Sequence, residues 1–359
     1  MYGRPAPDVP RYERLLVGAE FLASSHGKVP CQGCHSGPVR DDVDAAHRTV
    51  VRDPSLERVD VCAACHKDIV LGYEKALHNT LQGETAALVA RSGGSPLSAG
   101  LSEYAEQDCA TCHTTCGQCH VSRPDVAGGG LLRGHVFVKK PLMEETCLQC
   151  HGPETSSGLY TGGEGMAGDV HWTKAGMVCA DCHRGAELHG DGETYGNEGE
   201  VRKMPRCADC HSEGKPKTGA EHIIHVEKVS CYVCHSGPST SCFDCHEGTD
   251  GVAYRGELTF KVGLNVEADA QHPERYVVLR HVPVTRNTFE KLDGSLPGFD
   301  AVPTWKMSAP HNIQRVTPQT KSCNVCHGSR EPFLTSDDLL PGDSAVNEKV
   351  VVPVIPRGF

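Results

Sequence analysis

Apolar residues in this chain occur in short, interrupted runs, and no long periodic stretch is present. The longest candidate run, Val350 to Ile355, is broken by Pro353 and is much shorter than the ~18 residues that a membrane-spanning helix requires. Gly and Pro contribute 39 and 23 of the 359 residues, more than average usage. The pattern predicts short α-helices and loops around an apolar core that is small for the length of the chain.

Residues 247–322 have a different pattern. The segments 257–264 (ELTFKVGL) and 275–284 (RYVVLRHVPV) are rich in β-branched residues and are separated by turn residues. We therefore expect a small antiparallel β-element here. The C-terminal segment 348–359 (EKVVVPVIPRGF) is expected to be either a strand packed on its own domain or an extended arm that lies on a neighbouring subunit.

All 20 cysteines belong to ten copies of one motif, C-x-x-C-H, which is the attachment signature of c-type haem. In such a motif the two thiols form thioether bonds to the haem vinyl groups, and the histidine presents its imidazole to the iron. The expected thioether residues are Cys31, Cys34, Cys62, Cys65, Cys109, Cys112, Cys116, Cys119, Cys147, Cys150, Cys179, Cys182, Cys207, Cys210, Cys231, Cys234, Cys242, Cys245, Cys323 and Cys326. The expected proximal ligands are His35, His66, His113, His120, His151, His183, His211, His235, His246 and His327.

Zinc sites, iron–sulfur clusters and a disulfide framework are weaker interpretations of the same cysteines. Zinc sites combine two C-x-x-C units, or one such unit with distant histidines, and ten pairs permit that numerically. None of these alternatives explains why a histidine follows every second cysteine. The sequence therefore predicts ten covalently bound c-type haems.

The histidines outside the motifs supply a second set of ligands. Of 21 histidines, eleven lie outside the motifs, nearly one for each predicted haem, whereas there are only six methionines. This supply predicts an imidazole on both sides of every iron. The candidate distal ligands are His26, His47, His78, His135, His171, His189, His222, His225, His281 and His311, with His272 the weakest because it precedes Pro273 in the motif-free stretch.

The spacing of the motifs suggests how the chain is organised. With about 36 residues for each motif, the porphyrins themselves must form most of the core. Only Thr114 and Thr115 separate the third motif from the fourth, so these two haems are expected to be in contact or nearly so. We expect a nine-haem region over 1–246, a haem-free β-rich insert supplying distal histidines over 247–322, and the tenth haem with the tail over 323–359.

The net charge restricts the possible binding partners, and the need for export restricts the location of the protein. The formal net charge is −11 without a basic block, which excludes an electrostatic footprint for nucleic acid. The N-terminal residues have no apolar signal-peptide region. Because covalent haem attachment takes place outside the cytoplasm, we expect an exported protein whose signal peptide is absent from this numbering. The expected location is extracellular or at the cell surface, with the periplasm as the alternative.

Three segments resemble those of exported multihaem c-type cytochromes of anaerobic metal-reducing or syntrophic microbes. They are 109–124 (CATCHTTCGQCHVSRP), 169–183 (DVHWTKAGMVCADCH) and 311–328 (HNIQRVTPQTKSCNVCHG). Within that group the all-histidine, loop-rich pattern resembles the extracellular cytochrome filaments, or nanowires. The resemblance implies a head-to-tail homopolymer, or other multihaem cytochromes, as partners. It also implies an extracellular electron acceptor, and a role for a histidine such as His26 or His47 across a subunit interface.

The expected function is electron transfer without enzymatic turnover. Iron held by two imidazoles has no open position for a substrate, and all-histidine ligation keeps the potentials comparatively low. The alternative is a multihaem reductase of the tetrathionate, nitrite or hydroxylamine type. Enzymes of that kind keep one haem with an open or lysine-ligated site, often in a C-x-x-C-K motif, which this sequence lacks. A monomeric periplasmic electron shuttle is a further alternative.

Overall fold

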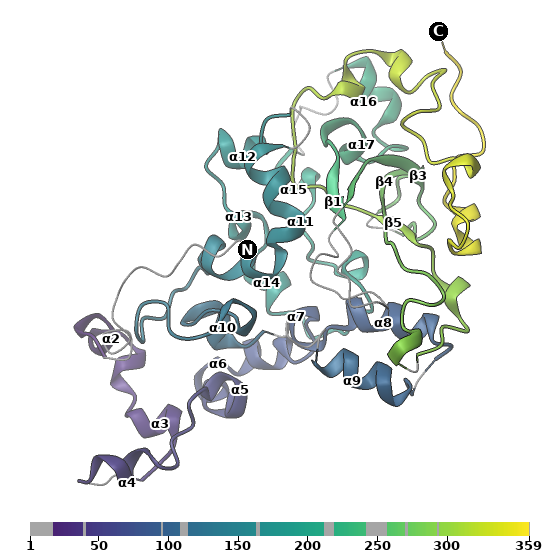
Figure 1. The fold of residues 1–359 in the computed structure, drawn as a ribbon. Coiled ribbons are helices and arrows are strands. Elements are labelled where there is room, and N and C mark those ends of the chain that lie inside the picture. Colours follow the sequence, from purple (N-terminus) through teal and green to yellow (C-terminus); the bar gives the residue numbers. More distant parts are fainter. Residues whose placement is uncertain are drawn as a thin grey trace. The chain divides into compact units, whose positions relative to one another are not determined.

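The fold consists mostly of short helices and loops, with 45% helix and 7% strand, and its small antiparallel sheets lie in the C-terminal third (Figure 1). This confirms the predicted mixture of short helices, loops and a late β-element. The computed structural model describes residues 17–38, 41–94, 96–107, 114–162, 166–211, 219–241, 257–269, 272–292 and 294–358.

The chain divides into two compact units that interleave along the sequence. Unit 1 comprises Met1–Gly83, Cys109–Cys150 and Cys179–Lys203, and unit 2 comprises Glu84–Asp108, His151–Val178 and Met204–Phe359. The division expected from the motifs, into 1–246, 247–322 and 323–359, follows the sequence continuously and stays a prediction.

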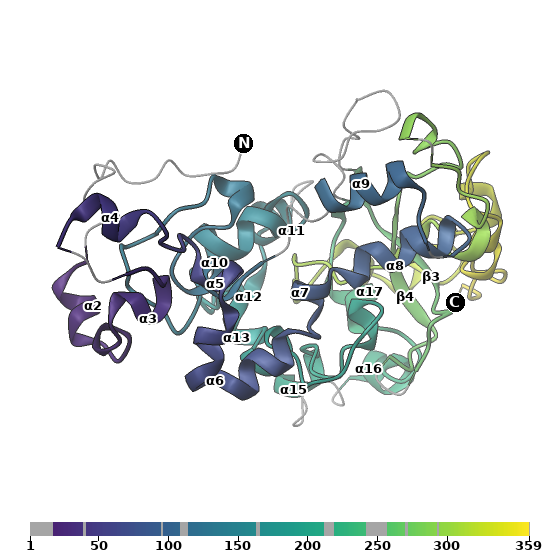
Figure 2. The same ribbon diagram turned by 90° about the horizontal axis from the view of Figure 1, so that it is seen from below.

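The helices of unit 1 are short, and most begin or end near a C-x-x-C-H motif (Figure 2). They are α2 (Ala19–Ala23), α3 (Cys31–His35), α4 (Val43–His47), α5 (Pro54–Glu57), α6 (Val59–Tyr73), α7 (Leu77–Thr80), α10 (Cys116–His120), the π-helix η4 (Met143–Cys147), α13 (Cys179–Cys182) and α14 (Gly185–Leu188). Two further helices cross the boundary between the units: α8 (Gln82–Arg91) and α11 (Leu148–Thr161).

Unit 2 combines short helices with the two sheets. Its α-helices are α9 (Ala99–Gln107), α12 (Val170–Thr173), α15 (Cys207–His211), α16 (Ala220–His225) and α17 (Cys231–His235), and the tenth motif begins a 3₁₀ turn, η9 (Cys323–Val325). The strands are β1 (Ser239–Ser241), β2 (Glu257–Thr259), β3 (Lys261–Leu264), β4 (Tyr276–His281) and β5 (Trp305–Met307). All strand pairs are antiparallel, in the orders β1-β2 and β3-β4-β5.

The predicted β-segments form these strands with two differences. Segment 257–264 is divided at Phe260, so its halves β2 and β3 belong to different sheets. The third strand of the larger sheet, β5, was not predicted; it covers only three residues. Strand β4 is buried on both faces, which explains why its sequence is a continuous apolar run instead of an alternating one.

The clusters of buried apolar side chains found in the described residues all lie in unit 2. Two of them enclose β4 from opposite faces, one around Leu279 and Trp305 and the other around Val262 and Val278. The third joins α8 and α9 to Phe299. The described part of unit 1, which carries motifs 1, 2, 4 and 6, contains only scattered buried apolar residues.

The C-terminal tail packs on its own unit. Val350, Val351 and Val352 are buried in the two clusters around β4. The Leu264 N–H donates to the Val350 carbonyl at 2.8 Å, and the Val352 N–H donates to the Leu334 carbonyl at 2.8 Å. Of the two arrangements expected for the tail, the structure has the one within the chain, without a regular strand. Among the described residues, no helix combines the length and the apolar character needed to cross a bilayer.

Candidate haem-binding sites

Five of the motifs form a short helical turn of their own, for example α3, α10 and α17. In a helix, residues i, i+3 and i+4 lie on one face, so the two cysteines and the histidine of C-x-x-C-H point in the same direction. Motif 4 shows the local reason for the turn: the Thr115 side chain accepts the Gln118 N–H, and the Gln118 side chain accepts the Thr115 N–H. The motif sequence thus presents three haem-binding groups from one local turn.

Six motif histidines within the described residues each face one histidine from outside the motifs. The distances between ring centroids are 5.9–6.2 Å, and the angles between ring planes run from 11° to 74°. The pairs, with the motif residue second, are His26–His66, His135–His35, His189–His120, His171–His211, His222–His235 and His225–His327. All six distal partners belong to the set that the sequence nominated.

These separations fit an iron held between the two rings. A metal–imidazole bond is about 2.0–2.1 Å long and a ring nitrogen lies about 1.1 Å from its ring centroid, so two axial imidazoles hold their centroids about 6.2–6.4 Å apart. Each ring can rotate about its own metal bond, so a wide range of interplanar angles is compatible with axial ligation. The six separations of 5.9–6.2 Å lie at or slightly below this range, so the pairs are close to the spacing that bis-imidazole ligation requires.

Hydrogen bonds at Nδ1 leave Nε2 available in several of these rings. The Nδ1 atoms of five candidate ligands donate to backbone carbonyls, among them His120 to Val138 at 2.6 Å and His35 to Val51 at 2.7 Å. The other three rings are His225, His235 and His327. Because a carbonyl oxygen can only accept, Nδ1 carries the proton and Nε2 is the unprotonated nitrogen, the form in which a neutral imidazole binds a metal. Such an outer hydrogen bond is typical of a ligating histidine.

Two further candidate ligands use carboxylates at Nδ1. His171 is bonded to Asp169 Oδ1 at 2.9 Å, and His183 is bonded to Glu187 at 2.9 and 3.1 Å. Sequence reasoning missed both acids. The signal was present in their spacing, since Asp169 precedes its histidine by two residues and Glu187 follows its histidine by four.

The pKa shifts of three paired rings from outside the motifs favour the neutral state that a metal ligand requires. Burial lowers the pKa of His26, His135 and His189, and repulsion from a charged motif histidine lowers it further. His183 differs. Burial alone would lower its pKa, but the hydrogen bond and charge of Glu187 raise it overall.

His281 is placed differently from the paired histidines. Its side chain is one-tenth exposed and packs against Trp305, with ring centroids 5.0 Å apart. Its Nε2 is bonded to Asp343 Oδ1 at 2.9 Å, so the nitrogen that would face an iron is already engaged with a carboxylate. We therefore leave His281 out of the ligand set proposed below.

The remaining candidate distal ligands lie at several places. The His78 carbonyl accepts the N–H of Thr114, two residues before motif 4, at 3.4 Å. The backbone of His311 lies against α11, the helix that carries His151. His47 ends α4, and the His272 N–H donates to Asp269 at 2.7 Å. The motif residues Cys109, Cys112, His113, Cys242, Cys245 and His246 lie outside the described residues.

Cysteines of different motifs meet within each unit. In unit 1 the Cys62 and Cys116 thiols are in hydrogen-bonding contact, as are those of Cys147 and Cys179. In unit 2 the same contact joins Cys207 and Cys231. None of the cysteines in the described ranges forms a disulfide. The contacts make motifs 2 and 4, motifs 5 and 6, and motifs 7 and 8 close neighbours.

Exposed apolar side chains flank the histidine pairs. Ile223 and Ile224, between the two ligand candidates of α16, are 70% and 59% exposed. Phe137 is 43% exposed and stacks on His26, with ring centroids 4.2 Å apart. Water is an unfavourable environment for such groups, whereas a porphyrin ring bound at the pair would cover them.

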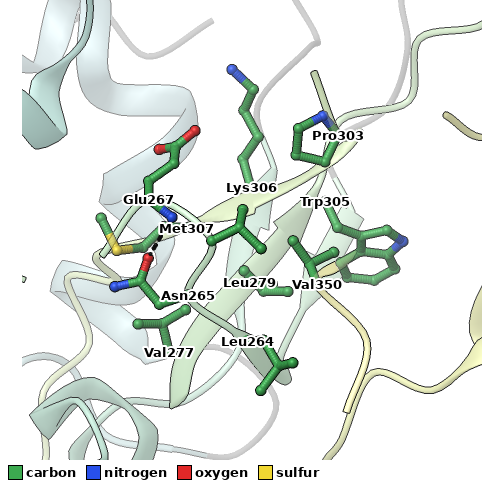
Figure 3. Close-up of a pocket in the computed structure, with 11 residues that line it drawn as sticks. Leu264, Asn265, Glu267, Val277, Leu279, Pro303, Trp305, Lys306, Met307 and Val350 are labelled. Carbon is green, nitrogen blue, oxygen red and sulfur yellow. Dashed lines mark hydrogen bonds between the residues drawn. The ribbon is translucent and has the colours of Figure 1, made fainter. Parts of the chain in front are cut away.

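A shallow pocket on one face of the larger sheet is chemically different from these sites. Leu264, Val277, Leu279 and Met307 line it, with Lys306 and Glu267 at its edge (Figure 3). Its lining contains neither cysteine nor histidine, so the pocket offers none of the groups that bind haem.

In the comparisons with known proteins, no family model, no curated protein and no solved structure matches this chain.

Proposed function

We propose that this chain is an exported multihaem c-type cytochrome that transfers electrons through ten covalently attached, bis-histidine haems. The observation that carries the proposal is the set of six histidine pairs, each joining a motif imidazole to a non-motif imidazole 5.9–6.2 Å away. Haem supplies reversible one-electron chemistry at its iron. At each site two cysteines would hold the haem covalently, and two imidazoles would supply nitrogen ligands to its iron.

The spacing of the motifs supports a relay in unit 1. Helix α3 of motif 1 contacts α6 of motif 2, and η4 of motif 5 contacts both α10 of motif 4 and α13 of motif 6. The Cys62–Cys116 contact brings motifs 2 and 4 together. Because each cysteine is bonded to the edge of its haem, neighbouring sulfurs require neighbouring haem edges. The contacts favour the order 1–2–4–5–6 among the described motifs of this unit.

Unit 2 has a similar succession. The Cys207–Cys231 contact joins motifs 7 and 8. Helix α17 of motif 8 contacts η8 (Pro318–Thr320), the turn immediately before motif 10. Helix α16 also links these motifs, since His222 faces His235 and His225 faces His327. One short helix therefore contributes imidazoles to two different haem sites.

The proposed ligation distinguishes electron transfer from the reductase alternative. With an imidazole on each side of every iron, no axial position is left for a substrate. We therefore assign the chain no enzymatic turnover. Assembly into a head-to-tail filament is a separate proposal that rests on the family resemblance. A size-exclusion peak far above 38.5 kDa and fibres in negative-stain images would support it, and a clean monomer at high concentration would exclude it.

Two measurements on the exported protein test the electron-transfer proposal. Pyridine haemochrome quantitation should return ten haems per polypeptide. Carbon monoxide added to the reduced protein should leave the Soret band essentially unchanged, because every iron has two protein ligands. Far fewer than ten haems would refute the proposal, and a carbon monoxide shift equivalent to one haem in ten would favour a reductase.

A further inference from the structure

Two of the candidate ligands with a described Nδ1 hydrogen bond differ from the other five in what Nδ1 contacts. Of the seven rings with a described Nδ1 bond, five donate to neutral backbone carbonyls. The other two are bonded to carboxylates: His183 to Glu187, and His171 to Asp169. His183 belongs to motif 6, and His171 faces His211 of motif 7 at 6.2 Å. The two carboxylates thus act at consecutive motifs.

Both carboxylates are enclosed and held in place. The Asp169 side chain is 6% exposed and that of Glu187 is 9% exposed. Asp169 is further fixed because Oδ1 accepts the His171 N–H and Oδ2 accepts the Ile313 N–H, both at 2.8 Å. Charges in such surroundings are screened less by water than charges at the surface. Each acid is therefore a fixed negative charge in contact with a candidate axial ligand.

We propose that Glu187 and Asp169 lower the midpoint potentials of the haems at motifs 6 and 7, and so set the two potentials separately from those at the five carbonyl-bonded rings. This inference rests on the proposed function. A carboxylate that accepts the Nδ1 proton makes the imidazole a stronger electron donor, and hydrogen bonds around a haem ligand are an established means of tuning its potential. The nearby negative charge also favours ferric over ferrous iron. Both acids are positioning residues that act through a histidine.

The test uses the full-length, haem-loaded protein with Glu187→Gln and Asp169→Asn variants. Each substitution keeps the size of the side chain and removes the charge. Spectroelectrochemical titration should show one midpoint potential moved upward in each variant, a different one in each, and both moved in the double variant. Glu187→Asp retains a carboxylate, so its midpoint potential should lie closer to the wild-type value than that of Glu187→Gln.

Matched controls remove one negative charge from exposed positions in the same units, through Glu193→Gln in unit 1 and Glu227→Gln in unit 2. These should produce only a small shift spread over many haems. If the haem midpoint potentials of Glu187→Gln and Asp169→Asn shift no more than those of their controls, the inference is overturned. A variant that retains ten low-spin haems with an unchanged potential also counts against it.

A measurement on the unmodified protein keeps the inference testable if a variant fails to retain its haems. The low-temperature EPR spectrum of the oxidised wild type should contain two low-spin signals with the stronger axial field expected of a carboxylate-bonded histidine. The absence of such signals would overturn the inference. Haem quantitation separates the two proposals. Too few haems in the wild type refutes the electron-transfer function itself, whereas ten haems with unmoved potentials refutes only the role of the two acids.

Discussion

Helix α16 carries two candidate ligands three residues apart, so removing one of them should open one iron and leave the others closed. The His222 ring faces His235 at 6.1 Å, and the His225 ring faces His327 at 6.1 Å. In His222→Ala, we expect the haem of motif 8 to keep its thioether bonds and its proximal histidine but to lose its distal ligand. With ten motifs in the chain, the low-spin signal should fall by about a tenth.

The neighbouring histidine is not positioned to replace the missing ligand. His225 Nδ1 donates to the Glu221 carbonyl at 2.7 Å, and the His225 ring is paired with His327. The two residues between the histidines, Ile223 and Ile224, have no ligating atoms. The open position should therefore persist and bind one carbon monoxide per chain in the reduced protein.

The assay is carbon monoxide difference spectroscopy, normalised by haem content, with resonance Raman spin-state bands as a second readout. His225→Ala should also bind one equivalent, at motif 10, and the double variant should bind two. His281→Gln is the matched control and should bind none, because His281 Nε2 is engaged with Asp343. The ligand assignment fails if His222→Ala binds no carbon monoxide, or if His281→Gln binds one equivalent.

Two other substitutions test the packing around the sites. In Gly72→Ala the added Cβ would lie 2.8 Å from the His189 carbonyl oxygen. We expect the free energy of unfolding, measured with denaturant, to fall by about 1–3 kcal/mol, and the His189–His120 pair to weaken, which would appear as a high-spin haem fraction. In the control Gly18→Ala the added Cβ meets nothing within 4 Å, so both readouts should stay unchanged. Phe299→Ala removes a fully buried ring from the cluster of α8 and α9 and should lower the free energy of unfolding by about 3–5 kcal/mol, measured as a lower thermal midpoint with the haem spectrum retained. The control Leu292→Ala, at a site 38% exposed, should have little effect on the midpoint. Equal midpoints for the two variants would contradict this account of the core.

The sequence by itself determined the features that depend on near neighbours in the chain. The C-x-x-C-H spacing places three haem-binding groups on one face of a helical turn, and α3, α10 and α17 have that local structure. The β-branched runs identified β3 and β4 for the same reason, because strand preference is visible within a few residues. β5, with only three residues, provides too short a pattern to be recognised.

The tertiary structure decided which distal histidine meets which motif. His26 lies just before motif 1 but faces His66 of motif 2, and His135 returns to His35 of motif 1. His281 belongs to the same residue type, yet it is bonded to Asp343. An isolated histidine has no local signal for its partner, because an axial ligand can come from any segment that the fold brings to the open side of the ring. Contacts that orient the motif histidines, such as His235 Nδ1 to the Gln314 carbonyl, also join residues distant in sequence and exist only once the chain has folded.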